Sequence, residues 1–466
     1  EEKDENLFNI QVGASINIFV RRQGGAASLS RLFYKELWGA RKTKLETLSQ
    51  CSLAPSTWQE LTPAPPSYFF TPKVFIGKET YMLGFSLADL FISLGMGVYT
   101  KRDSVVVRWE KGAAAQLLDD AASLGEAEFR ERYQTGEDRR DWTVANALAD
   151  VAKFGKDAVV AKYLYRPYDV RYVPYTGYTR GLFAFPSYKT FGVLLHPACY
   201  ALCITKAVHA ASYQHCFVVN GLADKTLLST RDVAYLLPLY RLPNTKAYTP
   251  AELAAGKTRA GEPVPLELNM RPEVLDKISA SVGTTVAGKE VFDYVYGVLH
   301  DPEYRTRYFE FLKIDYPRIP YPKDKAEFLA LVAKGAWLRR LHLMDESLEL
   351  PRVASFEVAG SNEVTRVCFE ETPAEAEQTS EGRVWINDTQ YFAHIPRRVW
   401  DHYVGAYQPV RLWLQKRVGR TLDFDDVRWY LRLCATVETE IAPLQPNGGG
   451  AVGELYATPS SQSGER

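Results

Sequence analysis

The sequence predicts a mixed α/β (α+β) fold, with an edge hairpin near its start, a mixed α/β domain after it and a helical C-terminal part. Three observations predict this class. Residues 8–20 alternate apolar with small or polar side chains, residues 163–240 hold short aromatic and β-branched runs between Gly and Pro, and residues 272–315 and 400–436 have helical spacing. With 466 residues and 46% hydrophobic content, the chain is long enough for about two to four domains.

The first elements form the predicted hairpin. Residues 8–20 read as a buried strand, and residues 31–34 as a second strand beside it, after a basic and Gly-containing turn. Residues 39–50 have the pattern of a short amphipathic helix. Four residues rich in proline, 63–66, then end regular structure.

Helices and one short strand are expected next. Residues 83–94 have helical spacing, and Ser86 offers an N-terminal cap. A turn at 95–97 leads to three valines at 105–107, which we interpret as a strand. Residues 111–160 are predicted to form helices with charged faces.

The second half repeats this alternation. Strands over 163–240 are followed by helices over 272–315, which a proline-rich strap at 317–322 ends. Strands are expected within 352–395 and helices within 400–436, where acidic residues near the helix start suit its dipole. The Gly- and Ser-containing residues beyond 445 predict a disordered tail.

Charge is unevenly distributed although the net charge is zero. Residues 151–240 carry ten Lys or Arg against four Asp, a net charge of +6, whereas residues 345–382 carry ten acidic residues against two Arg, a net charge of −8. A basic surface of this size is what contact with phosphates requires. It is equally what a solvated charged face looks like, so both interpretations stay open.

Cysteine and histidine patterns indicate a reducing compartment and no metal centre. Six Cys in so long a chain form no dense framework, and Cys199 and Cys203 have no second pair that would complete a zinc site. The seven His are scattered, without HxxxH or HEXXH spacing. With no signal peptide and no apolar run long enough for a membrane, we expect a cytoplasmic protein with no membrane partner. Because the chain opens at Glu1 directly before a strand pattern, we expect it to be part of a longer protein.

Familiar catalytic motifs are missing from the sequence. Residues 251–258 end like a phosphate-binding loop, but Ala251 stands where the first glycine is needed. The GMG at 95–97 is better interpreted as a turn than as a cofactor loop, and no GxSxG elbow occurs.

One segment carries a specific resemblance. YRPYDVRY at 165–172, followed by YTG at 175–177 and RG at 180–181, is similar to the YRPFDxRxxYYTGxxxG motif of Type ISP and Type IIG-like restriction–modification adenine-N6 DNA methyltransferases. Tyr168 stands where the motif has Phe.

Other segments resemble the same family in the same order. They are ENLFNIQVGA (5–14), FYKELWGARKTK (33–44), GVYTKRD (97–103), QHCFV (214–218), HDPEYR (300–305), FLKIDYPRIP (311–320) and GAYQPV (405–410), with WL at 413–414 and GR at 419–420. Ala406 replaces a Gly of the family pattern. The matches extend over most of the chain and resemble the C-terminal part of these enzymes.

The resemblance implies a division of the chain. Residues 1–45 would be the C-terminal strands of a methyltransferase domain, and residues 46–330 a target-recognition domain with the basic segment in its middle. Residues 331–445 would complete the recognition region, with the acidic segment and then helices, before a disordered tail at 446–466. The implied partners are double-stranded DNA and the methyltransferase domain of the parent chain, in the longest relatives with a helicase and a nuclease.

Catalysis by this chain alone is not expected. An adenine-N6 methyltransferase needs a Gly-rich turn for S-adenosylmethionine and a [DNS]PP[YF] tetrad for the flipped base. The nearest sequence, APPS at 64–67, lacks both the polar and the aromatic member. S-adenosylmethionine is therefore implied for the parent protein and not for this chain.

Candidate DNA contacts come from the basic middle and from the turn before 105. Arginine can bind guanine or phosphate, lysine binds phosphate, and tyrosine can stack or contact sugar. The candidate DNA-binding residues are Lys101, Arg102, Arg166, Arg171, Tyr175, Arg180 and Lys189. The competing interpretation for Arg166 and Arg171 is that Asp169 pairs with either one and braces the fold, and for Tyr175 it is core packing.

Two rival functions remain open at this point. One is a self-contained hydrolase that uses His215 or His300 with nearby acids, which requires a pocket around the histidine. The other is an interaction module whose acidic segment, 345–382, docks a partner protein.

Overall fold

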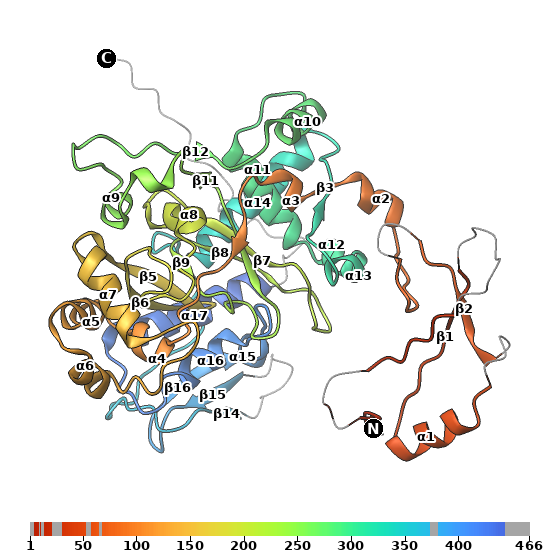
Figure 1. Cartoon of the computed structure of the whole chain (residues 1–466), viewed down its shortest axis with the longest axis horizontal. Coiled ribbons are helices and arrows are strands. Elements are labelled where there is room, and N and C mark those ends of the chain that lie inside the picture. The colour runs from red at the N-terminus through yellow and green to blue at the C-terminus, as the bar shows by residue number, and fades with distance from the viewer. Residues whose placement is uncertain are drawn as a thin grey trace. The chain divides into compact units, whose positions relative to one another are not determined.

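The computed structural model describes residues 4–8, 10, 14–20, 30–52, 57–64, 68–372 and 381–442 (Figure 1). Contacts between residues divide the chain into two units, Glu1–Phe75 and Ile76–Arg466. The domain boundaries predicted after residues 45, 330 and 445 stay predictions, and the tail predicted beyond 445 lies outside the described residues.

The smaller unit is built on one two-stranded antiparallel sheet. β1 (Leu32–Tyr34) pairs with β2 (Gln59–Leu61), and α1 (Arg41–Ser49) lies between them in the sequence. Lys44 of α1 is buried, and its Nζ binds the Asp4 carboxylate at 2.6 Å and donates to the Glu5 carbonyl at 2.8 Å. This lysine holds the start of the chain on the helix.

The predicted strand over 8–20 is not a strand in its described part. Residues 14–20 have no regular structure, and Ile18, Phe19 and Val20 are exposed. The hairpin partner of β1 is β2, which the sequence analysis did not predict as a strand. An alternating apolar pattern becomes a strand only when a neighbouring strand supplies its hydrogen bonds, and none of the described segments does so here.

Helices of the larger unit lie on several sides of small sheets. Their bounds are α2 Lys78–Leu83, α3 Leu87–Leu90, α4 Asp103–Val106, α5 Lys111–Ser123, α6 Glu126–Tyr133, α7 Val144–Phe154, α8 Tyr188–Phe191, α9 Pro250–Ala255, α10 Pro272–Val282, α11 Gly288–Leu299, α12 Pro302–Arg307, α13 Phe309–Leu312, α14 Lys325–His342, α15 Arg397–Asp401, α16 Pro409–Gln415 and α17 Phe424–Ile441. This agrees with the helical segments expected over 111–160, 272–315 and 400–436.

The strands of the larger unit belong to five sheets. Their bounds are β3 Phe85–Ser86, β4 Gly95–Met96, β5 Val159–Arg166, β6 Asp169–Tyr175, β7 Ala201–Thr205, β8 Cys216–Val219, β9 Leu222–Ala223, β10 Ala234–Pro238, β11 Tyr240–Arg241, β12 Glu267–Leu268, β13 Arg318–Ile319, β14 Cys368–Glu371, β15 Glu381–Trp385 and β16 Tyr391–Pro396. The larger sheets have the orders β4-β10-β7-β8, β6-β5-β9 and β14-β15-β16, and β13-β3 and β11-β12 are pairs. The mixed α/β class predicted from the sequence is confirmed.

Two local predictions were wrong. The helix expected over 83–94 is a single turn, α3, whose N-cap Ser86 accepts a hydrogen bond from the Ala88 amide at 3.2 Å. The strand expected at 105–107 is the end of helix α4 and the residue after it, with all three valines buried. β-branched residues prefer strands only weakly, so burial of these valines in the core outweighs that preference.

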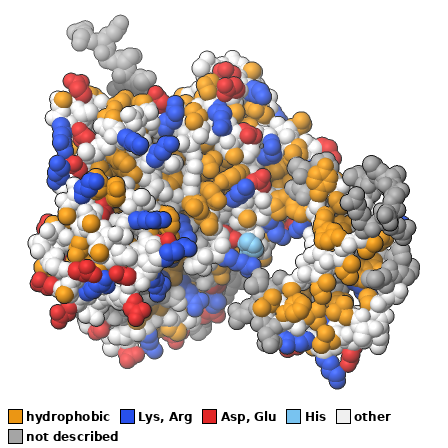
Figure 2. All heavy atoms as spheres, in the orientation of Figure 1, with side chains coloured by type: hydrophobic (Ala, Val, Ile, Leu, Met, Phe, Trp, Pro, Cys, Tyr) orange, Lys and Arg blue, Asp and Glu red, His pale blue; other side chains and the backbone are white. Residues whose placement is uncertain are grey.

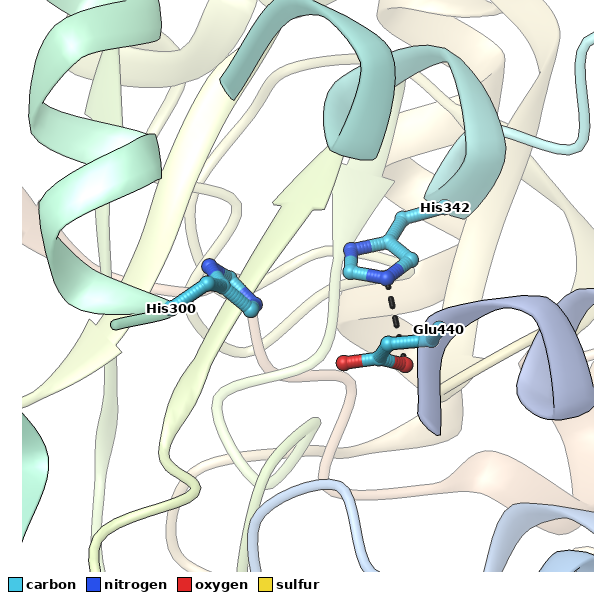
Figure 3. Close-up of side chains that lie close together, drawn as sticks. All are labelled: His300, His342 and Glu440. Atoms are coloured by element: carbon cyan, nitrogen blue, oxygen red, sulfur yellow. Dashed lines mark ion pairs between the residues drawn. The ribbon is translucent and has the colours of Figure 1, made fainter. Parts of the chain in front are cut away.

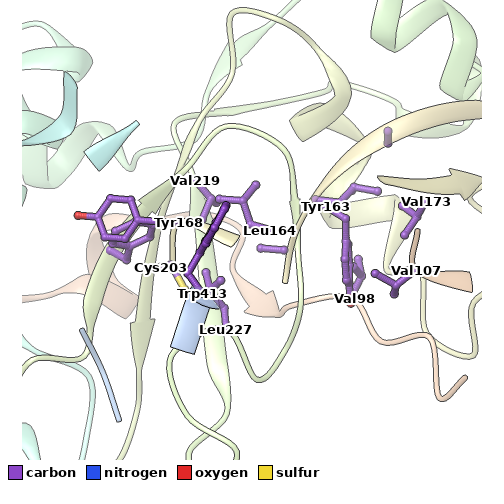
Figure 4. Close-up of a cluster of buried hydrophobic side chains, with 14 of the residues drawn as sticks. Val98, Val107, Tyr163, Leu164, Tyr168, Val173, Cys203, Val219, Leu227 and Trp413 are labelled. Carbon is purple, nitrogen blue, oxygen red and sulfur yellow. The ribbon is translucent and has the colours of Figure 1, made fainter. Parts of the chain in front are cut away.

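One hydrophobic core joins the central strands to the C-terminal helices. Figure 4 shows Tyr163 and Leu164 of β5 and Val173 of β6 in the same cluster as Val219 of β8 and Trp413 of α16. The core thus contains residues from Val98 to Val437, so the basic middle and the helical C-terminal part fold as one body.

Helices α11 and α14 cross at two glycines. A Cβ atom on Gly335 would lie 1.8 Å from the Asp293 carbonyl oxygen, and one on Gly297 would lie 2.4 Å from the Leu331 carbonyl oxygen. Beside the crossing, Arg339 donates two hydrogen bonds to Asp293, at 2.7 and 3.0 Å. The helices therefore approach backbone to backbone, with a buried ion pair between them.

We expect Gly335→Ala to lower the free energy of unfolding by about 2–3 kcal/mol, because the new methyl group meets backbone that cannot move aside. Gly112→Ala in α5 is the matched control, since a Cβ there has nothing within 4 Å; it should raise stability by up to ~1 kcal/mol. Urea unfolding followed by tryptophan fluorescence measures both. Equal unfolding midpoints for the two variants would contradict the close crossing.

Candidate nucleic-acid interface

Two lysine amino groups lie close to the ring of Tyr99 at the surface of the larger unit. The Nζ atoms of Lys225 and Lys101 are 4.0 and 4.9 Å from the centre of its ring. Lys101 is exposed, and Tyr99 and Lys225 are half-buried. Lys101 has an acidic neighbour, Asp141, at 3.7 Å. We call Tyr99, Lys101 and Lys225 the lysine–tyrosine cluster; its two cations and flat ring suit phosphate and sugar contacts.

Backbone pairing on both sides fixes this segment. The Tyr99 amide donates to the Phe185 carbonyl at 2.9 Å, and the Phe185 amide donates back at 3.0 Å. Val98 forms a parallel bridge with Asp224, the residue before Lys225. Lys101 adopts a left-handed conformation with φ of 63°, which turns the chain toward α4. The cluster is therefore assembled from two segments distant in sequence, and a third segment, at Phe185, holds Tyr99 in place.

A buried carboxylate and an indole anchor the neighbouring loop, 176–185. Asp150 of α7 accepts hydrogen bonds from the Thr176 hydroxyl and the Leu182 amide, both at 2.9 Å. The Trp142 indole donates to the Leu182 carbonyl at 3.0 Å. Burial raises the pKa of Asp150 above its usual value. Between these anchors the loop exposes Arg180, and Phe185 after them is also exposed.

Four of the seven predicted DNA-binding residues are accessible or partly so. Lys101, Arg180 and Lys189 are exposed. Arg102 is half-buried, with its guanidinium 5.0 Å above the Trp142 ring and its Nη2 donating to the Glu137 carbonyl at 2.5 Å. The structure brings Lys101, Arg102 and the loop of Arg180 together, because Trp142 contacts both Arg102 and the loop.

The other three predicted residues are buried. Tyr175 is fully buried and donates from its hydroxyl to the Pro186 carbonyl at 2.6 Å, a position from which its ring cannot stack on a base. Arg166 lies 3.6 Å from the Asp224 carboxylate, and Arg171 donates to Asp169 at 2.8 and 3.2 Å. Both arginines therefore brace the fold, as the competing interpretation predicted. The acid that pairs with Arg166 is Asp224, however, and not Asp169.

Arg171 belongs to a stack of guanidinium and indole groups. Its guanidinium lies 3.4 Å from the centre of the Trp109 ring. Arg417 lies 3.3 Å from the centre of the Trp413 ring and 3.5 Å from the Asp169 carboxylate. An open cavity of about 260 Å³ borders the stack, lined by Asp103, Ser104, Val107, Arg108, Trp109, Tyr165 and Arg171.

Charged side chains are unevenly distributed over the face of the larger unit that Figure 2 shows, and the acidic edge there is not the acidic segment, 345–382, that the sequence indicated. Figure 2 shows acidic side chains gathered at the edge that carries α5 and α6, whereas Lys and Arg side chains lie across the middle of the larger unit. Segregation of this kind leaves a basic surface that attracts a polyanion over distances of about a Debye length.

Sequence reasoning missed Tyr99, Phe185 and Lys225 as surface candidates. Lys225 was counted in the basic segment, but nothing in the sequence places it beside the turn at 97–101. The available signal for Tyr99 was that it belongs to GVYTKRD, one of the segments that resemble the family in the same order. No pattern marked Phe185, because a single exposed aromatic residue looks like a core residue in a sequence.

The two histidines of the rival hydrolase hypothesis each have an acidic residue nearby, Asp232 for His215 and Glu440 for His300, but the hypothesis also requires a pocket. His215 is fully buried, neither ring nitrogen has a hydrogen-bond partner, and the nearest carboxylate, Asp232, is 3.8 Å away. His300 has its Nδ1 2.9 Å from the Tyr296 carbonyl oxygen. Neither histidine lines the cavity described above. No helix of the described residues is long and apolar enough to cross a membrane.

Comparison with known proteins gives one family and several related structures. The model of the family "Type ISP C-terminal specificity domain" matches residues 89–438. A comparison with curated proteins gives no match. Similar solved structures include a DrdV–DNA complex determined by cryo-EM, with a TM-score of 0.59 and 19% identity over 88% of this chain and 42% of that chain.

Two further structures have the same fold. The ATP-dependent Type ISP restriction-modification enzyme LlaBIII bound to DNA has a TM-score of 0.57 and 19% identity, over 88% of this chain and 27% of that chain. A nuclease-deletion mutant of the Type ISP restriction-modification enzyme LlaGI in complex with a DNA substrate mimic has a TM-score of 0.55 and 18% identity. The match covers 88% of this chain and 32% of that chain. The chain thus spans less than half the length of each of these proteins.

We expect Asp169→Ala to lower the free energy of unfolding by about 3–5 kcal/mol, because it leaves the buried Arg171 and Arg417 without their shared carboxylate. Asp388→Ala is the control. Asp388 pairs with Arg366 at 3.5 Å, but both side chains are exposed, so its loss should change stability by less than about 0.5 kcal/mol. Chemical denaturation of the two variants measures the difference, and similar stabilities would disprove the bracing role.

Stability should fall between pH 6.5 and pH 4 because of His215. Burial lowers the pKa of His215 to about 4, from an ordinary value of 6.5. In this pH range His215 therefore binds a proton in the unfolded chain but not in the folded chain, which disfavours folding as pH falls. Between pH 7 and pH 5 the wild type should lose about 2 kcal/mol more stability than His215→Gln. Parallel pH profiles for the two proteins would show that His215 does not contribute.

Proposed function

Because the chain belongs to the Type ISP C-terminal specificity domain family, we propose that it recognises a short sequence in double-stranded DNA for a restriction–modification enzyme. The observation that carries the proposal is the lysine–tyrosine cluster beside the exposed Arg180 and Phe185. Cations that bind phosphate and side chains that reach base edges are the two components of specific DNA binding.

The residues divide into contacts and supports. Lys101 and Lys225 would bind phosphates, and Arg180 and Phe185, held out by the anchored loop, would approach the bases. Arg102 and Lys189 would add phosphate contacts at the margin. Arg166, Arg171 and Tyr175 would act through the fold, because their side chains are buried. This division supports a recognition surface made of loops on a rigid sheet, the usual arrangement of binding residues.

The parent enzyme would contribute the chemistry. We place adenine-N6 methylation, with its S-adenosylmethionine, in a methyltransferase domain outside the recognition unit, and any DNA cleavage in further domains of the same cytoplasmic protein. The support is the missing [DNS]PP[YF] tetrad and the partial coverage of the longer DNA-bound structures. Flipping of the target adenine needs a duplex held in one register, which the recognition surface would provide.

We expect the Lys101→Ala/Lys225→Ala variant to bind duplex DNA more weakly, with a smaller dependence on salt. Each phosphate contact contributes about 0.9 to the slope of log K against log salt, so two lost contacts should reduce it by about 2. The measurement is fluorescence anisotropy with a random-sequence duplex pool at several salt concentrations.

The matched control is Lys277→Ala/Lys289→Ala, which removes two exposed lysines from α10 and α11. It has the same charge change and should keep the wild-type slope. Equal slopes for the two double variants would reject the cluster as a phosphate site. No salt-dependent binding by the wild type would instead favour the interaction module based on the acidic segment, 345–382.

A further inference from the structure

Four helix ends meet inside the larger unit and bring together ionisable side chains. His300 directly follows α11, His342 is the last residue of α14, and Glu440 is the next-to-last residue of α17. His402 directly follows α15. Figure 3 shows His300, His342 and Glu440 pointing toward one another from these different helices.

The distances among these groups suit ligands of one ion. One ligand atom of each of His300, His342 and Glu440 lies within 4.8 Å of the others. The Glu440 oxygen Oε2 is 3.2 Å from His342 Nε2 and 3.6 Å from His402 Nε2. Ligands at about 2.0–2.2 Å from a tetrahedral Zn²⁺ lie roughly 3.3 Å apart, so small side-chain rotations would close the site.

The second nitrogen of each ring is held by the same residue. His342 Nδ1 is 2.6 Å from the Tyr296 hydroxyl, and His300 Nδ1 is 2.9 Å from the Tyr296 carbonyl oxygen. This leaves Nε2 of both rings as the atom that can bind a cation. Metal-binding histidines are oriented in this way, with the other ring nitrogen hydrogen-bonded to a neighbouring group.

The inward-pointing atoms are buried and face one another. His342 is 4% exposed, and its Nε2 has the Glu440 carboxylate as its ion-pair partner. His402 Nε2 faces the same carboxylate oxygen, which makes no hydrogen bond of favourable geometry. Two imidazole nitrogens and a carboxylate oxygen therefore converge on one buried point, where a cation could bind all three.

The electrostatic surroundings favour a cation. The carboxyl ends of α11, α14 and α17 carry negative partial charge, which they direct at the shared point.

We propose that His300, His342 and Glu440 bind one Zn²⁺ ion that joins the ends of α11, α14 and α17. Imidazole nitrogens with a carboxylate are a ligand set for this ion, and His402 is placed beside Glu440 as the nearest additional ligand. The role is structural, since the ion would connect the middle of the chain to its last helix. The sequence predicts no metal site, because its ligands come from helices far apart in the chain and form no spacing motif.

The first experiment measures zinc in the full 466-residue chain. After equilibrium dialysis against Zn²⁺ and removal of free ion, elemental analysis should find one Zn²⁺ per chain. His342→Ala and Glu440→Gln should each lose it. His394→Asn is the control, because His394 is exposed and has an acidic neighbour, Glu381, at 3.4 Å; it should keep the full content. No zinc in the wild type, or equal content in all variants, would overturn the proposal.

Two further measurements do not depend on how the variants fold. At Zn²⁺ about 100-fold above Kd, the melting temperature of the wild type should rise by roughly 5 °C and return on adding a chelator. Wild type loaded with Co²⁺ in place of Zn²⁺ should show the visible absorption of tetrahedral nitrogen–oxygen coordination. A wild type with neither the thermal shift nor the absorption would show that the cluster is a hydrogen-bonding network alone.

Discussion

Asp169 occupies the position on which the larger unit depends. Its carboxylate is buried between the guanidinium groups of Arg171 and Arg417, at 2.8 and 3.5 Å. Arg171 belongs to strand β6, and Arg417 follows helix α16, so one carboxylate joins the central hairpin to the C-terminal helices. Two guanidinium groups in a core are tolerable only with such a partner and with aromatic faces, here those of Trp109 and Trp413, to cover them.

The proposed recognition surface is held rigid by this arrangement. Strand β5 pairs with β6, and its Tyr163 hydroxyl donates to the buried Asp224 carboxylate, which also lies 3.6 Å from Arg166. Asp224 directly precedes Lys225, so the chain that presents this lysine is held by the hairpin behind it. The buried charged residues of the basic middle thus support the sheet, and the charged residues on its loops form the surface that we propose binds DNA.

The cluster of His300, His342 and Glu440 is likewise distinct from the surface residues. His300, His342 and Glu440 lie where helices end, and strand β8 of the four-stranded sheet contributes Phe217, whose ring stacks on His342 with centres 5.7 Å apart. A cation bound there would connect helices α11, α14 and α17, none of which contributes a residue to the lysine–tyrosine cluster. Recognition and the proposed zinc site therefore depend on different residues, and each can be changed without removing the groups of the other.

The sequence by itself determined the mixed α/β class, the order of most elements and the family, because periodicity and ordered motifs such as YRPYDVRY are local properties. It also identified Lys101 and Arg180 as surface cations and offered bracing as the alternative for Arg171. The tertiary structure determined the burial and the long-range contacts, which local patterns do not contain. Tertiary contacts bury Tyr175, place Lys225 against Tyr99, put Val105 and Val106 in a helix and bring His300, His342 and Glu440 to one point. The physical reason is that burial and pairing depend on contacts between residues distant in the chain, and these contacts outweigh local preferences that amount to about 1 kcal/mol or less per residue.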